Sequence, residues 1–157
     1  RRYGRDLKTM SEHAVLNANY LRHKIMQEAE AKGVKHLFCD GAPAEVVKHE
    51  FTLSFAPMKE QKGVGAMDIA KGLLDKGYMS PTVYFPLIVP ECMMIEPTET
   101  ESKDVLDEFA IKFIEVLQED PDVLHEAPIT TDVRRVDEVY AARNLILSYP
   151  FENENSQ

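Results

Sequence analysis

The chain has 157 residues, and its 27 acidic residues outnumber its 18 basic ones, which gives a formal net charge of -9. An acidic chain repels a phosphate backbone unless its basic residues are segregated; here they are scattered, which argues against nucleic acid as a partner. The length suits a single domain with a sizeable core. No apolar run approaches a bilayer span and no signal-peptide core follows the first residues, so we expect a soluble, intracellular protein that binds no membrane.

The cysteines and histidines form no recognisable metal or redox motif. Cys39 and Cys92 lie far apart without CxxC spacing, which favours reduced thiols over a disulfide. The five histidines also lack metal-ligand spacing. The sequence therefore predicts no metal site.

The N-terminal part of the chain predicts a long helix. Thr9 and Glu12 have the spacing of a capping box that would start it, and Gly33 provides a left-handed stop. Residues 34–39 then predict a short strand and residues 40–43 a turn. The apolar stripe of the helix consists of Ala14, Ala18, Leu21, Ile25 and Ala29.

The clearest strand pattern covers residues 45–55, where apolar and polar side chains alternate. Residues 56–65 contain two glycines and two lysines and predict a loop. A helix is then expected from Ala66 to Gly77. The apolar face of the strand consists of Val47, His49, Phe51, Leu53 and Phe55.

Two further strands are predicted at residues 82–85 and 91–95. Pro86 and Pro90 separate them, and because proline cannot donate to a ladder, the pair indicates an edge strand or an interrupted connection.

Thr98 and Glu101 predict a second capping box and a helix that ends before Pro121. A short helix is expected at residues 136–143, and the polar tail 151–157 is expected to be disordered. The order of elements predicts an α+β fold for residues 1–150, with a small antiparallel or mixed sheet covered by helices on one face. The stripe of the helix after Glu101 consists of Leu106, Phe109, Ala110, Phe113 and Leu117.

Two places in these patterns are candidate sites. His49 stands on the apolar strand face, where a histidine is more often a core or interface residue than a catalytic one, and both interpretations stay open. Glu96, Pro97 and Thr98 lie between a strand and a helix, where ligand-contacting side chains are common. Helix capping explains Thr98 well and Glu96 less well.

Two adjacent arginines form a third candidate. Arg134 and Arg135 fit a carboxylate or phosphate contact. Because Asp132 and Asp137 flank them, local ion pairs are the favoured interpretation.

Three segments carry a resemblance to a known family: residues 82–102 (TVYFPLIVPECMMIEPTETES), 14–21 (AVLNANYL) and 128–139 (PITTDVRRVDEV). Together they resemble the C-terminal part of the second subunit of glycine dehydrogenase (decarboxylating), the P-protein of the glycine cleavage system. The resemblance implies the C-terminal small domain, with an extension, of an aminotransferase-like enzyme that uses pyridoxal phosphate. The large cofactor-binding domain would precede it.

The resemblance also implies an activity and partners. The full-length enzyme would decarboxylate glycine and transfer the aminomethyl group to the lipoyl arm of the H-protein, together with its large domain and subunit 1, in a prokaryotic cytoplasm. His49-Glu50 matches a His-Glu pair at this place in the family. We therefore take His49, Glu96 and Thr98 as the candidate catalytic residues.

No cofactor is expected on this chain alone. A pyridoxal phosphate enzyme needs a lysine for the Schiff base and a cradle for the phosphate, and neither is identifiable in the sequence. The fragment is therefore expected to be inactive by itself. The alternative is a stand-alone α+β ligand-binding or regulatory module without catalysis, because fold does not determine function.

Overall fold

The computed structural model describes residues 4–41 and 46–148, and it confirms an α+β fold. Four strands form one fully antiparallel sheet in the order β1-β2-β4-β3. Within the described residues, none of the helices combines the length and apolar character needed to cross a membrane. In chain order the elements are η1 (Gly4–Asp6), α1 (Leu7–Ala31), η2 (Lys35–Leu37), β1 (Cys39–Asp40), β2 (Phe51–Ser54), α2 (Ala56–Lys62), α3 (Ala66–Asp75), β3 (Thr82–Val83), β4 (Cys92–Ile95), α4 (Lys103–Gln118), α5 (Pro121–Glu126) and α6 (Glu138–Arg143).

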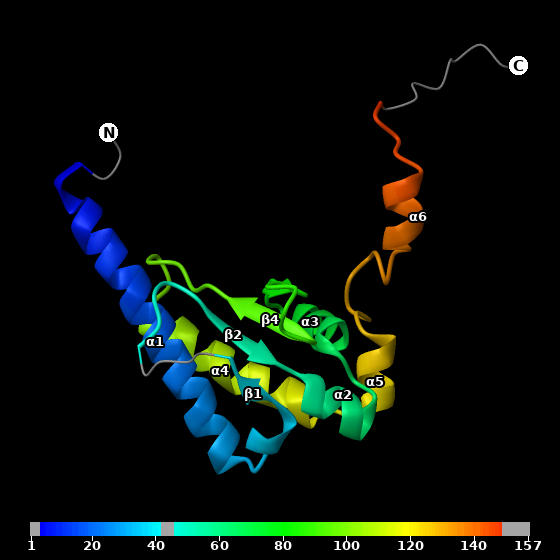
Figure 1. Cartoon of the computed structure of the whole chain (residues 1–157), viewed down its shortest axis with the longest axis horizontal. Coiled ribbons are helices and arrows are strands. Elements are labelled where there is room, and N and C mark those ends of the chain that lie inside the picture. The colour runs from blue at the N-terminus through cyan, green and yellow to red at the C-terminus, as the bar shows by residue number, and fades with distance from the viewer. Residues whose placement is uncertain (1–3, 42–45, 149–157) are drawn as a thin grey trace, which may run out of the picture.

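The long helices α1 and α4 lie across one face of the sheet, as the sequence predicts (Figure 1). Leu53 of β2 and its partner Met93 of β4 are fully buried on that face. The neighbouring pair Thr52 and Met94 is only half-buried. Because side chains alternate between faces along a strand, the sheet has one packed face and one partly open face.

Four of the five residues of the predicted α1 stripe, Ala18, Leu21, Ile25 and Ala29, are buried, whereas Ala14 is only partly buried. The predicted capping box is wrong. A short 3-10 turn leads directly into α1 at Leu7, so that Thr9 and Glu12 lie inside the helix. Gly33 has a φ of 70° and provides the predicted stop.

The region between α1 and β2 is less extended than predicted. Residues 34–39 form mainly the 3-10 turn η2 followed by β1, and the strand predicted at 45–55 begins only at Phe51. The side chain of Asn19 bonds both backbone groups of Val47, which removes the donor and acceptor that a longer strand would use. Residues 42–45, which include the second half of the predicted turn, lie outside the described residues.

The loop predicted at residues 56–65 is instead the helix α2. It is short enough to lack a clear apolar period, but Pro57 lies in its first turn and Gly63, with a φ of 74°, ends it. The next predicted helix is confirmed as α3, and Gly77 follows it with a φ of 84°.

The two later strands are confirmed but are shorter than predicted. β3 is an edge strand, and Pro86 and Pro90 lie in the turn that joins it to β4. The two prolines therefore lie outside the ladder, where their lack of a backbone N–H donor costs no hydrogen bond.

The predicted start of α4 is wrong, although four residues of its predicted stripe are buried and Phe109 is partly buried against the core. The N-cap is Ser102, whose Oγ accepts from the Val105 amide, and neither Thr98 nor Glu101 caps the helix. The sequence also missed α5, which Asp120 caps. α6 confirms the helix expected at residues 136–143, whereas the tail 151–157 lies outside the described residues.

Phe113 packs α4 against Phe55, the residue that follows β2, and its loss tests this packing. Its ring centroid lies 6.0 Å from that of Phe55 and 5.9 Å from that of Phe109. We expect Phe113→Ala to lower the free energy of unfolding by about 3–5 kcal/mol, measured by urea titration. Ile111 on the same helix is 44% exposed, and Ile111→Ala, the matched control, should change it by less than about 1 kcal/mol. Equal losses in both variants would contradict this description of the core.

Candidate functional site

The antiparallel register of β2 and β4 brings two candidate residues together. Phe51 pairs with Ile95, so His49 just before β2 lies close to Glu96 just after β4. The Nε2 of His49 is 3.7 Å from the Oε1 of Glu96, and these side chains are 51% and 55% exposed. His49 is therefore not a core residue of this domain, whereas an interface role and a catalytic role both remain compatible with its exposure.

Glu50 completes a small polar cluster with this pair. One ligand atom from each of His49, Glu50 and Glu96 lies within 4.8 Å of the other two. The three groups could offer one imidazole and two carboxylates to a cation, but two of them are exposed to solvent. Exposed acidic groups commonly carry no ion, so the cluster is better described as a polar rim.

Asn19 of α1 positions the segment that carries His49. Its Nδ2 donates to the Val47 carbonyl at 2.8 Å, and its Oδ1 accepts from the Val47 amide at 2.9 Å. This two-point contact fixes the backbone two residues before His49. An asparagine amide can satisfy one donor and one acceptor at once, which an aliphatic residue cannot.

Asn17 positions the other segment. Its Nδ2 donates to the carbonyls of Thr98 and Glu101 at 2.8 and 3.1 Å. The hydroxyl groups of Thr98 and Thr100 lie 2.7 Å apart within the same loop. Neither asparagine was predicted as a site residue. Their position gave one signal, because asparagine is unfavourable inside a helix unless its side chain makes hydrogen bonds elsewhere.

Glu96 and Thr98 line a hollow of about 400 Å³ between the loop 96–101, residues 78–81 and α4. Its wall is largely apolar and includes Val105 and Phe109, and His49 is not part of it. Among the described residues, no lysine lines the hollow. It therefore does not supply the lysine with which a pyridoxal phosphate enzyme holds its cofactor.

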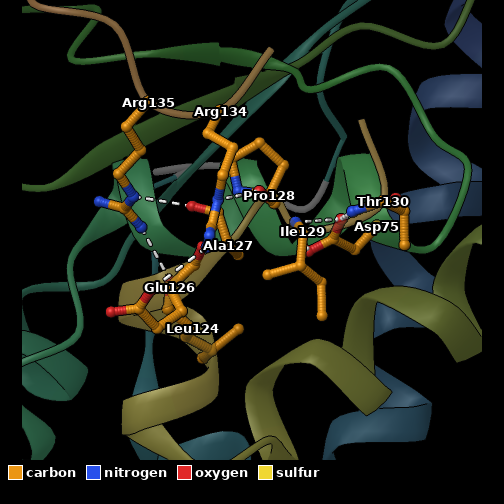
Figure 2. Close-up of polar contacts among 9 residues, drawn as sticks. All are labelled: Asp75, Leu124, Glu126, Ala127, Pro128, Ile129, Thr130, Arg134 and Arg135. Carbon is orange, nitrogen blue, oxygen red and sulfur yellow. Dashed lines mark hydrogen bonds and ion pairs between the residues drawn. The ribbon is translucent and has the colours of Figure 1, made fainter. Parts of the chain in front are cut away.

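The candidate arginines donate to backbone carbonyls and hold a segment in place (Figure 2), and Arg135 also lines a hollow beside Val136 and Val139. Arg135 donates to the carbonyls of Ala127 and Leu124 at 2.7 and 2.8 Å, and its Nη1 lies 2.8 Å from a carboxylate oxygen of Asp68. These carbonyls lie at the C-terminal end of α5, where a cation also complements the helix dipole.

Arg134 has a similar role beside it. It donates to the backbone carbonyl of Glu126 at 2.6 Å and contacts the carboxylate of the same residue at 3.1 Å. Ion pairing was predicted, but with different partners. Asp137 instead caps α6, by accepting from the Tyr140 amide at 2.8 Å.

Asp75 anchors the same segment, residues 128–137, which we call the strap. Its carboxylate accepts from the amides of Ile129 and Thr130, each at 2.8 Å, and from the Thr130 hydroxyl at 2.7 Å (Figure 2). Partial burial acts to raise the pKa of Asp75, but these hydrogen bonds outweigh it and hold the pKa below its ordinary value of 3.8. The folded strap thus favours the ionised carboxylate.

Asn19→Ala tests the positioning of the His49 segment. We expect hydrogen exchange of the Val47 amide to become roughly two- to tenfold faster, because a lost hydrogen bond is worth about 0.5–1.5 kcal/mol. Asn17→Ala is the matched control: its side chain contacts the carbonyls of Thr98 and Glu101, so exchange at Val47 should stay unchanged. Unchanged exchange in Asn19→Ala would show that another contact holds this segment.

Asp75→Asn tests the anchor of the strap through its pH dependence. A carboxylate whose pKa is lowered by folding stabilises the protein fully above its unfolded pKa, and this contribution is lost as the pH falls through the folded pKa. The difference in unfolding free energy between the parent chain and Asp75→Asn should be constant near neutral pH and shrink below about pH 4. Urea titrations across this range measure it, and a difference that stays constant in acid would refute the anchor.

Comparison with known proteins gives this geometry a context. The family "Glycine dehydrogenase, C-terminal domain" matches residues 10–137. A protein of Desulforamulus reducens named "probable glycine dehydrogenase (decarboxylating) subunit 2" is 48% identical over 149 residues, which cover 93% of this chain and 29% of the relative. A protein of the same name from Aquifex aeolicus is 48% identical over 150 residues, covering 94% and 29%. This chain thus spans less than a third of these relatives' length, and it belongs to the family of the glycine dehydrogenase C-terminal domain.

Proposed function

We propose that this chain works as the C-terminal part of a pyridoxal-phosphate-dependent glycine decarboxylase. Residues 1–150 form its small domain with an extension, and the cofactor belongs to a large domain of the same subunit. The observation that carries the proposal is the family match over residues 10–137, in a chain that spans only 29% of its relatives. The enzyme passes the aminomethyl group of glycine to the lipoyl arm of an H-protein and works in the cytoplasm.

The name "subunit 2" of the relatives supports a partner subunit 1. The site geometry fits an incomplete active site whose remaining wall comes from elsewhere. Glu96 and Thr98 line an open hollow, and two asparagines of α1 fix the segments around it. Hydrogen bonds of this kind, from side chains outside the site to the segments that carry it, hold reactive groups in place, which catalysis requires.

His49 and Glu96 have the geometry of a proton-handling pair at the rim of this site. Imidazole is the side chain that most often transfers protons in enzyme catalysis, and the Oε1 of Glu96 lies 3.7 Å from the Nε2 of His49. We assign these two residues to holding and moving a proton between His49 Nε2 and the substrate. Thr98 supplies a hydroxyl that can donate to a substrate oxygen or accept from its nitrogen.

The test uses the full-length protein supplied with pyridoxal phosphate and H-protein, and it measures carbon dioxide released from carboxyl-labelled glycine. His49→Ala and Glu96→Gln should each lower turnover at least about tenfold, or roughly 1.4 kcal/mol of transition-state stabilisation. The melting temperature should hardly change, because both side chains are half exposed. Glu60→Gln, at an exposed carboxylate on α2, is the matched control and should keep full turnover.

The outcomes separate three cases. Normal turnover in both variants would remove His49 and Glu96 from the site and leave the decarboxylase proposal intact. A full-length protein that releases no carbon dioxide from glycine would overturn the proposal and favour a stand-alone ligand-binding module. The 157-residue chain should release none, and borohydride should fix no cofactor on it.

A further inference from the structure

The turn between β3 and β4 presents large apolar side chains to solvent. Leu87 and Ile88 are 85% and 91% exposed, and Phe85 is 54% exposed. Burying such side chains elsewhere would be favourable, by roughly 1.5–3 kcal/mol for each one. We call residues 84–89 the apolar turn.

The apolar turn is held rigidly instead of collapsing onto the core. The Tyr84 amide donates to the Cys92 carbonyl at 2.8 Å, and the Ser54 hydroxyl donates to the Pro90 carbonyl at 2.7 Å. Just beyond the turn, the Glu91 carboxylate accepts from the Ala66 amide at the start of α3, at 2.8 Å. The turn and the two residues after it are thus tied to β4, β2 and α3.

The backbone on both sides of the apolar turn is also strained. Tyr84 has a φ of 60° and Glu91 a φ of 46°, a region that residues with a side chain rarely adopt. Such strain persists where the surrounding contacts impose it and is common at functional sites. A rigid apolar projection loses little entropy when another surface covers it.

α6 continues this exposed surface. Val136, Val139 and Tyr140 follow helical spacing and are 56%, 60% and 65% exposed. Val136 and Val139 line one hollow of about 310 Å³ together with Tyr84 of the apolar turn. The two segments therefore meet at Tyr84, although they are far apart in the sequence.

The strap fixes α6 relative to the domain body. α6 stands away from the other helices and has no buried residue of its own (Figure 1). The strap before it is nevertheless held through Arg135 to Asp68 and through Thr130 to Asp75. Because the segment before α6 is fixed while the helix itself projects, its exposed apolar side chains are available to contact another part of the protein.

We propose that the apolar turn and α6 form one docking surface for the part of the same polypeptide that precedes this domain in the relatives. The inference rests on the proposed function and names the surface by which the domain meets the rest of its subunit. The chain spans 29% of its relatives, so about 71% of their length lies outside this structure and is available to cover the surface. The surface consists of Phe85, Leu87, Ile88, Val136, Val139 and Tyr140.

The small size of the surface favours an occupant from the same polypeptide. Stable contacts between separate proteins bury about 1,200–2,000 Å², which six side chains do not provide. A covalently connected segment faces no such requirement, because the connection holds it at a high effective concentration.

The experiment uses photo-crosslinking in the full-length protein with Cys39→Ser, which removes the exposed native thiol. Ile88→Cys and Val139→Cys each receive a benzophenone maleimide, and mass spectrometry identifies the residue joined after irradiation. Lys32→Cys, at an exposed position just after α1, is the matched control. We expect both test positions to join residues that precede the domain in the same polypeptide, and denaturing urea to abolish these products.

Three results would overturn the proposal. They are cross-links to another subunit only, cross-links to a second copy only, or yields no higher than at the control position. The readout does not depend on glycine turnover. If the protein cross-links as expected but releases no carbon dioxide, the docking surface is supported and the proposed function is refuted. If it releases carbon dioxide but does not cross-link as expected, the docking surface is refuted and the proposed function is supported.

Discussion

The packing of α1 against α4 across one face of the sheet is the contact on which the rest of the structure depends. It buries Leu21 and Ile25 of α1 together with Ala110 and Phe113 of α4. Burial of apolar surface supplies most of the favourable free energy of folding. Because this packing fixes the rotation of α1, it also determines which α1 side chains reach the strand ends.

Two asparagines of α1 link this packing to the candidate site, because their side chains bond to the two segments that carry the candidate residues. Asn17 and Asn19 are two residues apart and so lie on different faces of the helix, where Asn17 contacts the loop after β4 and Asn19 the segment before β2. Both segments lack ladder partners at these points, so side-chain amides satisfy backbone groups that strands would otherwise pair. The arrangement shortens β2 and leaves His49 and Glu96 at the surface, beside an open hollow.

At the other end of the domain, charged side chains stabilise the strap, whereas apolar packing stabilises the core. The strap has few buried side chains. Asp75 holds it by accepting from its backbone amides, and Arg135 of the strap donates to the Ala127 carbonyl and pairs with the carboxylate of Asp68. Hydrogen bonds to charged groups are stronger than neutral ones, which explains how so exposed a segment keeps a defined path. The apolar side chains of α6 therefore remain available outside the domain.

The sequence by itself determined most of the buried stripes of α1 and α4, the glycine stops and the α+β class, because periodicity and local turn chemistry depend on neighbouring residues. The motifs at residues 14–21, 82–102 and 128–139 carried the resemblance to the family. The sequence misplaced both capping boxes, since Ser102 and the 3-10 turn before Leu7 compete for the same helix ends. Only the tertiary structure decided the pairing of His49 with Glu96 and the partners of Arg135. These contacts join residues far apart in the chain, and no local pattern encodes which distant donor and acceptor will meet.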